Sequence, residues 1–272
     1  MRGFSVITIV KNREKALKNL VRGLINNEVK PDELVVVHMN EEPYSLGDLP
    51  FRVKSSVFLS DIDCPLAAAR NTGAELASFD RLIFLDVDCI PGSDYIKCFE
   101  TTWEDNSLLS GTVRYLSAKA SFSSDLFLKL DYYSKADPLR SNLNILPYEL
   151  FWSLNFGCSS ALFRKIGRFD ENYLGYGAED TDFSFAARKE NVPLKIVKAV
   201  AYHQHHAAFS PPLNHLNDIV PNATMFHKKW KVWPMEGWLK QFEEMGLVNW
   251  NDDCLEVLRQ PTAEELAKSI KD

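Results

Sequence analysis

Two short acidic runs hold the side chains best suited to do chemistry in this 272-residue sequence. In the first run, Asp86 and Asp88 are separated by one residue, follow the apolar stretch 82–85 and precede a Pro-Gly turn. Carboxylates at a strand end can hold a divalent cation through oxygen ligands while a diphosphate supplies the remaining ones. The cation would neutralise the charge that develops on a leaving diphosphate. The pair therefore predicts a metal site, with ordinary acidic turn residues as the alternative.

The second run places Glu179, Asp180 and Asp182 at the start of a predicted helix, where the helix dipole favours negative charge. Gly175 and Gly177 come just before it, and glycine lets the backbone approach a ligand closely. A carboxylate in this position can act as a general base and take the proton of an acceptor hydroxyl. The simpler alternative is charge placement at a helix start together with one helix cap.

Three histidines, His203, His205 and His206, follow the apolar stretch 194–201. Imidazoles at a strand end are compatible with a metal ligand. We expect one of them to bind a metal and the other two to be solvated.

These residues are positioned by an alternation of strands and helices. Apolar, β-branched runs predict strands at 4–10, 34–39, 51–59, 82–85, 108–116 and 194–201. Apolar residues at helical spacing predict a helix after the first strand, with Asn12 as a possible cap, and Pro65 opens an alanine-rich helix. The alternation predicts an α/β fold with a mostly parallel central sheet flanked by helices, and ligands bound outside the carboxyl ends of its strands.

The second half of the chain departs from this alternation. We expect an aromatic-rich amphipathic helix at 122–136 and a loop at 141–152, followed by a glycine-punctuated block at 155–191. A long functional loop is expected at 203–234, and a tail of two or three short helices at 237–272. Pro261 and Thr262, followed by Glu264 or Glu265, resemble a helix start. The aromatic run 228–238 is expected to pack the tail onto the main domain, with an acceptor platform as the alternative.

Composition limits the class of protein. A chain that is 46% hydrophobic and 25% charged can form a core without disulfides or metals. A formal net charge of −6 with scattered basic residues argues against nucleic acid as a partner. Five cysteines without close CxxC spacing favour reduced thiols. The apolar run before Lys11 is too short for a signal peptide or a membrane span. We therefore expect a cytoplasmic protein without a transmembrane segment.

Two longer motifs resemble one group of enzymes. LIFLDVDCIPG, at 82–92, looks like the D-V-D segment of β-1,4-galactosyltransferases and is similar to the D-x-D segments of family 2 glycosyltransferases. The block 156–189 resembles the acceptor-side region of the same enzymes, where a G-x-G-G-E-D-x-D core follows a G-F-x-x-x-Y stretch. VITIVKNREKALKNL also looks like their first strand and helix.

The resemblance implies a GT-A type glycosyltransferase fold with a helical C-terminal tail. It predicts a GT-A domain at 1–206, divided into a nucleotide-sugar-binding half at 1–110 and an acceptor-side half at 111–206. The remaining residues, 207–272, would form a loop and a helical extension packed on that domain.

The resemblance also implies roles for the second acidic run. Asp180 would be the general base of an inverting transfer, since related retaining enzymes lack a carboxylate there, and Glu179 would orient acceptor hydroxyls. Tyr176, where the galactosyltransferases have tryptophan, would stack on a sugar ring. Gly177 and Asp182 would complete the acceptor site.

For the metal, the resemblance implies Mn²⁺ or Mg²⁺ held by Asp86, Asp88 and a histidine after the strand. His203 keeps the closer alignment, and a small gap would make the ligand His205 instead. For the donor, it implies contacts with Val10, Lys11, Arg13, Asn40, Glu41, Arg70, Asp86 and Val87. Arginine suits a phosphate or a uracil edge, because its guanidinium donates in a planar, bidentate way. Family 2 enzymes usually carry an aspartate after the second strand for the uracil, and Asn40 or Glu41 would substitute for it here.

Together these features predict an inverting, metal-dependent transfer of a hexose or N-acetylhexosamine from a UDP-sugar to a carbohydrate or a small hydroxylated acceptor. One alternative is a metal-dependent nucleotidyltransferase, but ITIVKNREKA lacks the glycine-rich phosphate loop of such enzymes. The other alternative is a non-catalytic carbohydrate-binding relic, which the presence of Asp86, Asp88 and Asp180 disfavours.

Overall fold

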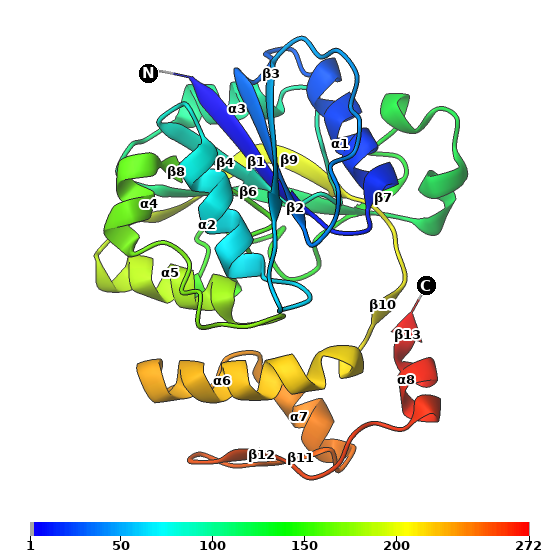
Figure 1. The fold of residues 1–272 in the computed structure, drawn as a ribbon, viewed down its shortest axis with the longest axis vertical. Coiled ribbons are helices and arrows are strands. Elements are labelled where there is room, and N and C mark those ends of the chain that lie inside the picture. The colour runs from blue at the N-terminus through cyan, green and yellow to red at the C-terminus, as the bar shows by residue number, and fades with distance from the viewer. Residues whose placement is uncertain (1–2, 272) are drawn as a thin grey trace.

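The chain is built around a nine-stranded sheet with helices on both faces (Figure 1). The computed structural model describes residues 3–271, so residues 1, 2 and 272 of the predicted units lie outside the described residues. The strands of the sheet are β1 (Phe4–Val10), β2 (Glu33–Met39), β3 (Arg52–Phe58), β4 (Arg81–Leu85), β5 (Cys89–Pro91), β6 (Leu108–Leu116), β7 (Ser134–Ala136), β8 (Asn155–Ser159) and β9 (Leu194–His203). Their order is β3-β2-β1-β4-β8-β6-β9-β5, and β7 pairs with β6.

The sheet has a parallel half and a mixed half. The strands β3, β2, β1 and β4 run parallel to one another. Beyond β4, β8 is antiparallel to both β4 and β6, β9 is parallel to β6, and β5 is antiparallel to β9. The predicted α/β fold is confirmed, and its sheet is mixed. Three of the four parallel pairs lie in the first four strands and the fourth is β6 with β9, while the other four pairs are antiparallel. Parallel strands bring their carboxyl ends to one edge, so the residues after β1, β2 and β4 meet there.

Two helices cover opposite faces of the parallel half. Val6 and Val10 of β1 pack into the core that contains α1 (Glu14–Asn26), whereas Ile7 and Ile9 pack into the core that contains α2 (Leu66–Leu76). β1 and β2 are buried along their whole length, as expected for strands covered on both faces. The remaining helices of this part are α3 (Tyr95–Thr102), α4 (Ser160–Ile166), α5 (Glu179–Lys189) and the short 3-10 turns η1 (Ala118–Phe122), η2 (Leu126–Leu128) and η3 (Tyr148–Leu150).

The C-terminal extension, residues 207–271 of the described chain, lies beside the carboxyl-end edge and α5 (Figure 1). It contains β10 (Ala208–Phe209), η4 (Leu213–His215), α6 (Leu216–Trp230), α7 (Glu236–Glu244), β11 (Val248–Trp250), β12 (Leu255–Val257), α8 (Ala263–Ser269) and β13 (Ile270–Lys271). β11 pairs with β12, and β10 pairs with β13. The extension buries its own apolar cluster, which includes Ile219, Leu239 and Phe242. Across residues 3–271, no helix combines the length and the apolar character that crossing a membrane requires.

The predicted helix start at Pro261 and Thr262 is confirmed by α8. Thr262 caps α8 through a capping box, in which its hydroxyl accepts from the N–H of Glu265 and the Glu265 carboxylate accepts from the N–H of Thr262. The aromatic run 228–238 packs only in part onto the main domain. Trp230 and Met235 lie against the cluster that contains Tyr173 and Phe185, whereas Trp233 and Trp238 pack against the extension's own cluster.

The predicted helix at 122–136 is wrong. This segment forms the end of η1, η2, a turn and β7. Phe122, Leu128 and Tyr132 are 90%, 86% and 80% exposed, whereas four other apolar side chains of the segment pack against the cluster that contains Leu116 and Tyr202: Leu126, Phe127, Leu130 and Tyr133. Most helical stability in proteins comes from packing one continuous apolar face, and only part of the apolar residues of this segment is packed.

The expectation of an irregular loop over all of 203–234 is also wrong, because its second half forms α6. Leu216, Ile219 and Phe226 recur at helical spacing and are buried. Pro221 lies inside the helix, where it removes one backbone donor. The apolar burial along α6 outweighs that local cost.

Candidate active site

The first acidic run lies in the tight turn between β4 and β5. The N–H of Asp86 donates to the carbonyl of Leu154 (2.9 Å), and the N–H of Cys89 donates to the carbonyl of Asp86 (2.8 Å). These bonds fix the turn against the segment before β8. Val87 is 8% exposed and packs into the core on the α1 side, so its backbone is the part that remains for a ligand.

Asp88 lies in a group with two histidines. The antiparallel register of β5 and β9 pairs Cys89 with His203, which brings His203 beside Asp88. The N–H of Gln204 donates to the carbonyl of Asp88 (2.6 Å), and the chain then turns so that Nε2 of His206 lies 3.6 Å from a carboxylate oxygen of Asp88. Ligand atoms of Asp88, His203 and His206 all lie within 4.8 Å of one another.

This group suits a divalent cation by its donor chemistry. It offers one carboxylate and two imidazoles, a mixed set that Mn²⁺ accepts more readily than Mg²⁺, which prefers oxygen ligands. Burial lowers the pKa of His203, although the charge of Asp88 opposes that effect, and neutral imidazole is the form that binds a metal. The alternative ligand His205 is not part of this group. His206, which was expected to be solvated, belongs to it.

Asp86 faces a different partner. Its carboxylate lies 3.3 Å from Nη2 of Arg70, and Nη1 of the same guanidinium lies 3.1 Å from Glu179 at the start of α5. Burial alone would lower the pKa of Arg70, but Asp86, Glu179 and Asp180 raise it overall. Arg70 is 5% exposed and therefore connects the two acidic runs instead of standing free for a phosphate.

The second acidic run opens α5 just after three residues with left-handed backbone. The φ angles of Gly175, Gly177 and Ala178 are 69°, 101° and 72°. A non-glycine residue with such a φ is strained, and this kind of strain gathers at functional sites. Burial, followed by the charge of Glu179, raises the pKa of Asp180 to about 7. A carboxyl group near neutrality is suited to receive a proton at physiological pH.

Tyr176, predicted to stack on a sugar, already stacks on a side chain from the extension. Its ring centroid lies 4.4 Å from that of His215, with 19° between the planes, and 6.0 Å from that of Trp238. Burial raises the pKa of Tyr176, and the charges of Glu179 and Asp180 raise it further, so its hydroxyl lies within electrostatic range of both carboxylates. The face of the Tyr176 ring is therefore occupied by His215, and the stacking of this ring on a sugar stays a prediction.

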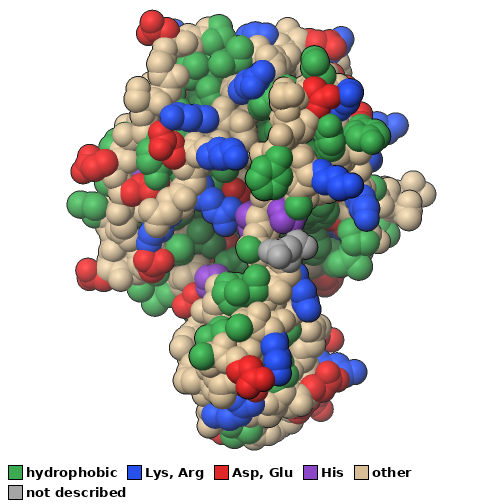
Figure 2. Space-filling view, turned by 90° about the vertical axis from the view of Figure 1, so that its right-hand side faces the viewer, with side chains coloured by type: hydrophobic (Ala, Val, Ile, Leu, Met, Phe, Trp, Pro, Cys, Tyr) green, Lys and Arg blue, Asp and Glu red, His purple; other side chains and the backbone are tan. Residues whose placement is uncertain are grey.

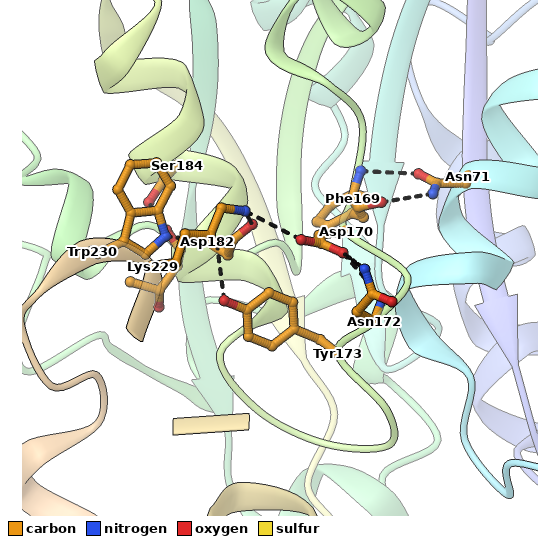
Figure 3. Close-up of polar contacts among 10 residues, drawn as sticks. Asn71, Phe169, Asp170, Asn172, Tyr173, Asp182, Ser184, Lys229 and Trp230 are labelled. Carbon is orange, nitrogen blue, oxygen red and sulfur yellow. Dashed lines mark hydrogen bonds and ion pairs between the residues drawn. The ribbon is translucent and has the colours of Figure 1, made fainter. Parts of the chain in front are cut away.

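Asp182, predicted to contact the acceptor, is buried among partners from the protein itself (Figure 3). It accepts hydrogen bonds from the hydroxyl of Tyr173 (3.0 Å), Nε1 of Trp230 (2.6 Å) and Nζ of Lys229 (2.9 Å). Figure 3 shows these side chains converging on Asp182, with Lys229 also reaching Asp170. The contacts indicate that Asp182 joins α5 to α6 instead of meeting a ligand.

Several predicted donor residues gather at the ends of β1 and β2, where other residues of the protein already contact them. Val10 is fully buried at the end of β1. Nζ of Lys11 donates to the carbonyl of Asp63 (2.7 Å) and also pairs with its carboxylate. Nδ2 of Asn40 donates to the carbonyl of Ile62 (2.9 Å). The segment 60–63, which follows β3, is thus part of this edge. No motif in the sequence indicated a role for this segment.

Glu41 and Asn12 complete this edge. The carboxylate of Glu41 accepts from the N–H of Asn12 (2.6 Å) and from the hydroxyl of Tyr44 (2.7 Å). Asn12 has a left-handed φ of 54° and is not the cap of α1, whose N-cap position is Arg13 without a side-chain cap. The predicted cap is therefore wrong, because Asn12 serves the turn between β1 and α1.

A cleft of about 360 Å³ opens beside the histidine group. Its lining includes Arg13, Lys15, Asp88, Ser123, Phe127 and His206. Nη1 of Arg13 lies 3.1 Å from Asp88. Figure 2 shows histidine side chains near the junction of the main body and the extension, with Lys and Arg side chains above them. The histidine group is therefore reachable from solvent and lies in basic surroundings.

Sequence comparisons relate the chain to known glycosyltransferases. The glycosyl transferase family 2 model matches residues 5–124. A validoxylamine A glucosyltransferase from Streptomyces hygroscopicus subsp. limoneus is 25% identical over 71% of this chain and 49% of its own length. A chondroitin synthase from Pasteurella multocida (strain Pm70) is 24% identical over 74% of this chain and 25% of its own length. The chain thus spans half or less of these relatives.

Solved structures share the fold at lower identity. GalNAc-T7, crystallised with UDP, GalNAc and Mn²⁺, aligns with a TM-score of 0.55 at 16% identity, over 75% of this chain and 43% of its own. S. aureus TarS 1–349 in complex with UDP-GlcNAc aligns with a TM-score of 0.53 at 18% identity, over 75% of this chain and 59% of its own. The predicted GT-A fold and the resemblance to family 2 glycosyltransferases are confirmed. The likeness to β-1,4-galactosyltransferases stays a prediction.

Proposed function

We propose that this chain is a divalent-metal-dependent, inverting glycosyltransferase. It moves a hexose or N-acetylhexosamine from a UDP-sugar to a hydroxyl of a carbohydrate or a small hydroxylated acceptor, with Asp180 as the general base. The observation that carries the proposal is the placement of Asp88, His203 and His206 at the same edge as Arg70, which joins Asp86 to Glu179 beside Asp180. One end of this arrangement suits a diphosphate, and the other suits an acceptor hydroxyl.

The donor would lie along the ends of β1 and β4. Asp88, His203 and His206 would hold the cation, which neutralises negative charge on the departing UDP. Arg13, next to Asp88, supplies a planar donor for a phosphate oxygen. The similar solved structures support a UDP-sugar donor, since the TarS crystals contain UDP-GlcNAc or UDP and the GalNAc-T7 crystal contains UDP with Mn²⁺. Mn²⁺ is the preferred cation because two of the three ligands are imidazoles.

The transfer is a single displacement. The acceptor oxygen forms a bond to the anomeric carbon, while the bond from that carbon to the diphosphate oxygen breaks and its electron pair leaves with UDP. The hydroxyl proton passes to the Asp180 carboxylate, which a pKa of about 7 leaves able both to ionise and to take up a proton at neutral pH. Glu179, held by Arg70, and the hydroxyl of Tyr176 would orient the acceptor.

The proposal is tested by incubating the protein with UDP-sugars, Mn²⁺ and candidate glycan acceptors, and by following UDP release and product stereochemistry. We expect a β-linked product from an α-linked donor. Asp180→Asn should retain binding of Mn²⁺ and UDP but lower turnover at least about a hundredfold, because the amide cannot accept the proton. An α-linked product, or near-normal turnover of the variant, would reject this mechanism.

This incubation, together with a second one that contains a nucleoside triphosphate and a sugar phosphate, separates the other two functions. A nucleotidyltransferase would release pyrophosphate from a nucleoside triphosphate and a sugar phosphate and would release no UDP from a UDP-sugar. A carbohydrate-binding relic would bind glycans and yield no product with any donor. Either result would overturn the transferase proposal.

A further inference from the structure

The helix α6 of the C-terminal extension contacts the loop that leads into α5. The amide nitrogen of Asn222 donates to the carbonyls of Leu174 (2.9 Å), Tyr176 (3.3 Å) and Gly177 (3.0 Å). Asn222 is 3% exposed, and three carbonyl oxygens surround its amide nitrogen, so only a donor satisfies this position. One side chain thereby fixes the backbone over four consecutive residues of the loop.

Asp218 lies one turn before Asn222 and contacts the same loop. Its carboxylate accepts from the N–H of Tyr176 (3.3 Å) and pairs with Nδ1 of His215 (3.2 Å). A Cβ on Gly175 would lie 2.5 Å from the Asp218 side chain, and the φ of Gly175 is +69°. Glycine at 175 therefore permits both the left-handed turn and the close approach of α6.

The far end of α6 holds α5 itself. Lys229 and Trp230 donate to the buried carboxylate of Asp182, which is two residues beyond Asp180. α6 therefore fixes the chain on both sides of Asp180: Asn222 and Asp218 act before it, and Lys229 and Trp230 act after it. The intervening residue Ala178 has a φ of 72°, a conformation that needs support from its surroundings.

We propose that α6 is a positioning element for the transfer reaction, in which Asn222 and Asp218 hold the 174–178 loop so that Glu179 and Asp180 face the acceptor. The inference rests on the proposed function of Asp180. It makes the extension a working part of the acceptor site, since its side chains Asn222, Asp218 and His215 shape the loop and cover the Tyr176 ring. Asn222 and Asp218 act through the backbone and are positioning residues.

The test compares Asn222→Ala with Asn222→Asp in the full chain. Alanine removes the donor, whereas aspartate keeps the shape and directs a carboxylate oxygen at three carbonyls. Both should lower kcat by about tenfold to a hundredfold, the scale on which misplaced catalytic groups reduce turnover. The KM for the UDP-sugar and the Mn²⁺-dependent affinity for UDP should stay unchanged. Asn217→Ala is the control on the same helix, because Asn217 is exposed and pairs with Gln260.

A second measurement does not depend on turnover. Amide hydrogen exchange of residues 174–178 should speed up in both Asn222 variants and stay unchanged in Asn217→Ala. Unchanged exchange and unchanged kcat in folded Asn222 variants would overturn the positioning role. If the Asn222 variants do not fold, the half-exposed Asp218 serves as Asp218→Ala, with the same expectations and the same overturning result. Wild-type protein that transfers no sugar to any acceptor would reject the proposed function, while the exchange data would still decide whether α6 holds the loop.

Discussion

His203 and His206 lie at the two ends of the short turn that follows β9, and both approach Asp88. The path of this turn decides which histidines can bind a metal, and the sequence could not reveal that path. Strand pairing with Cys89 fixes His203, so the preference for His203 over His205 follows from the end of an apolar strand. The return of the chain to His206 depends on the bond from Gln204 to the carbonyl of Asp88, a contact between distant segments. Spacing within three close histidines does not contain that information.

The histidines give a prediction at the residue scale. His203→Ala and His206→Ala should each weaken Mn²⁺-dependent UDP binding by at least about tenfold, because each removes one of three clustered ligand atoms. His205→Ala is the matched control and should bind as the wild type does. Titration calorimetry with UDP, with and without Mn²⁺, measures the effect. Normal binding by both His203→Ala and His206→Ala would reject this group as the metal site.

The roles of the second acidic run were harder to separate by sequence. Glu179, Asp180 and Asp182 are chemically alike and lie within four residues, so the pattern assigned all of them to the ligand. Helix geometry distinguishes them, since Asp182 faces α6 whereas Glu179 faces Arg70. A buried carboxylate with partners from another helix becomes visible only when that helix is placed.

At the scale of elements, the four parallel strands β1 to β4 were predictable, whereas the short strands β5, β7 and β8 and several helices were not. Continuous apolar β-branched runs such as 34–39 identify strands buried on both faces. α6 was missed because Pro221 and the dense His, Pro and Trp content masked a helical spacing of apolar residues. The segment 122–136 was wrong in the opposite way, since only some of its apolar residues pack against the core while Phe122, Leu128 and Tyr132 stay exposed. In both cases tertiary packing decided the outcome.

The joint between α5 and α6 gives a prediction about stability. Asp182→Asn should lower the free energy of unfolding by about 2–3 kcal/mol, because it leaves Lys229 without its buried partner and disturbs the bond from Trp230. Urea denaturation measures this change. Asp170→Asn is the control, since Asp170 also pairs with Lys229 but is more exposed, and its loss should cost less. A larger effect at Asp170 would show that the joint depends on the other carboxylate.

At the scale of the whole molecule, the sheet, α5 and the extension bring carboxylates together, and their mutual repulsion costs folding stability. Asp86, Glu179 and Asp180 share one guanidinium, that of Arg70, in a largely buried region. One cation does not neutralise three carboxylates, so negative charge on Asp180 is unfavourable. Burial and then the charge of Glu179 raise the pKa of Asp180 to about 7. Functional sites commonly hold groups that the rest of the fold must stabilise.

The raised pKa of Asp180 predicts how the free energy of unfolding depends on pH. A carboxyl group whose pKa is higher in the folded than in the unfolded state binds its proton more tightly when folded. Its penalty is absent below the unfolded pKa of 3.8 and develops as the pH rises towards about 7. Asp180→Asn removes the ionisable group, so the variant should gain stability over the wild type as the pH rises. Since each pKa unit corresponds to about 1.4 kcal/mol, the gain from about pH 4 to about pH 8 should be at least about 2 kcal/mol.

The measurement is urea denaturation of both proteins across that pH range, in the presence of a chelator so that no bound cation alters the carboxylates. Taking the difference between variant and wild type cancels the other titrating groups that the two proteins share. Asp61→Asn changes an exposed aspartate in the loop before α2 and should show no such trend. A difference for Asp180→Asn that stays flat with pH would mean that the fold does not penalise the Asp180 charge. The group proposed as the base would then lack the raised pKa that suits it to general base catalysis at neutral pH, because folding stability and proton affinity at Asp180 have one physical cause.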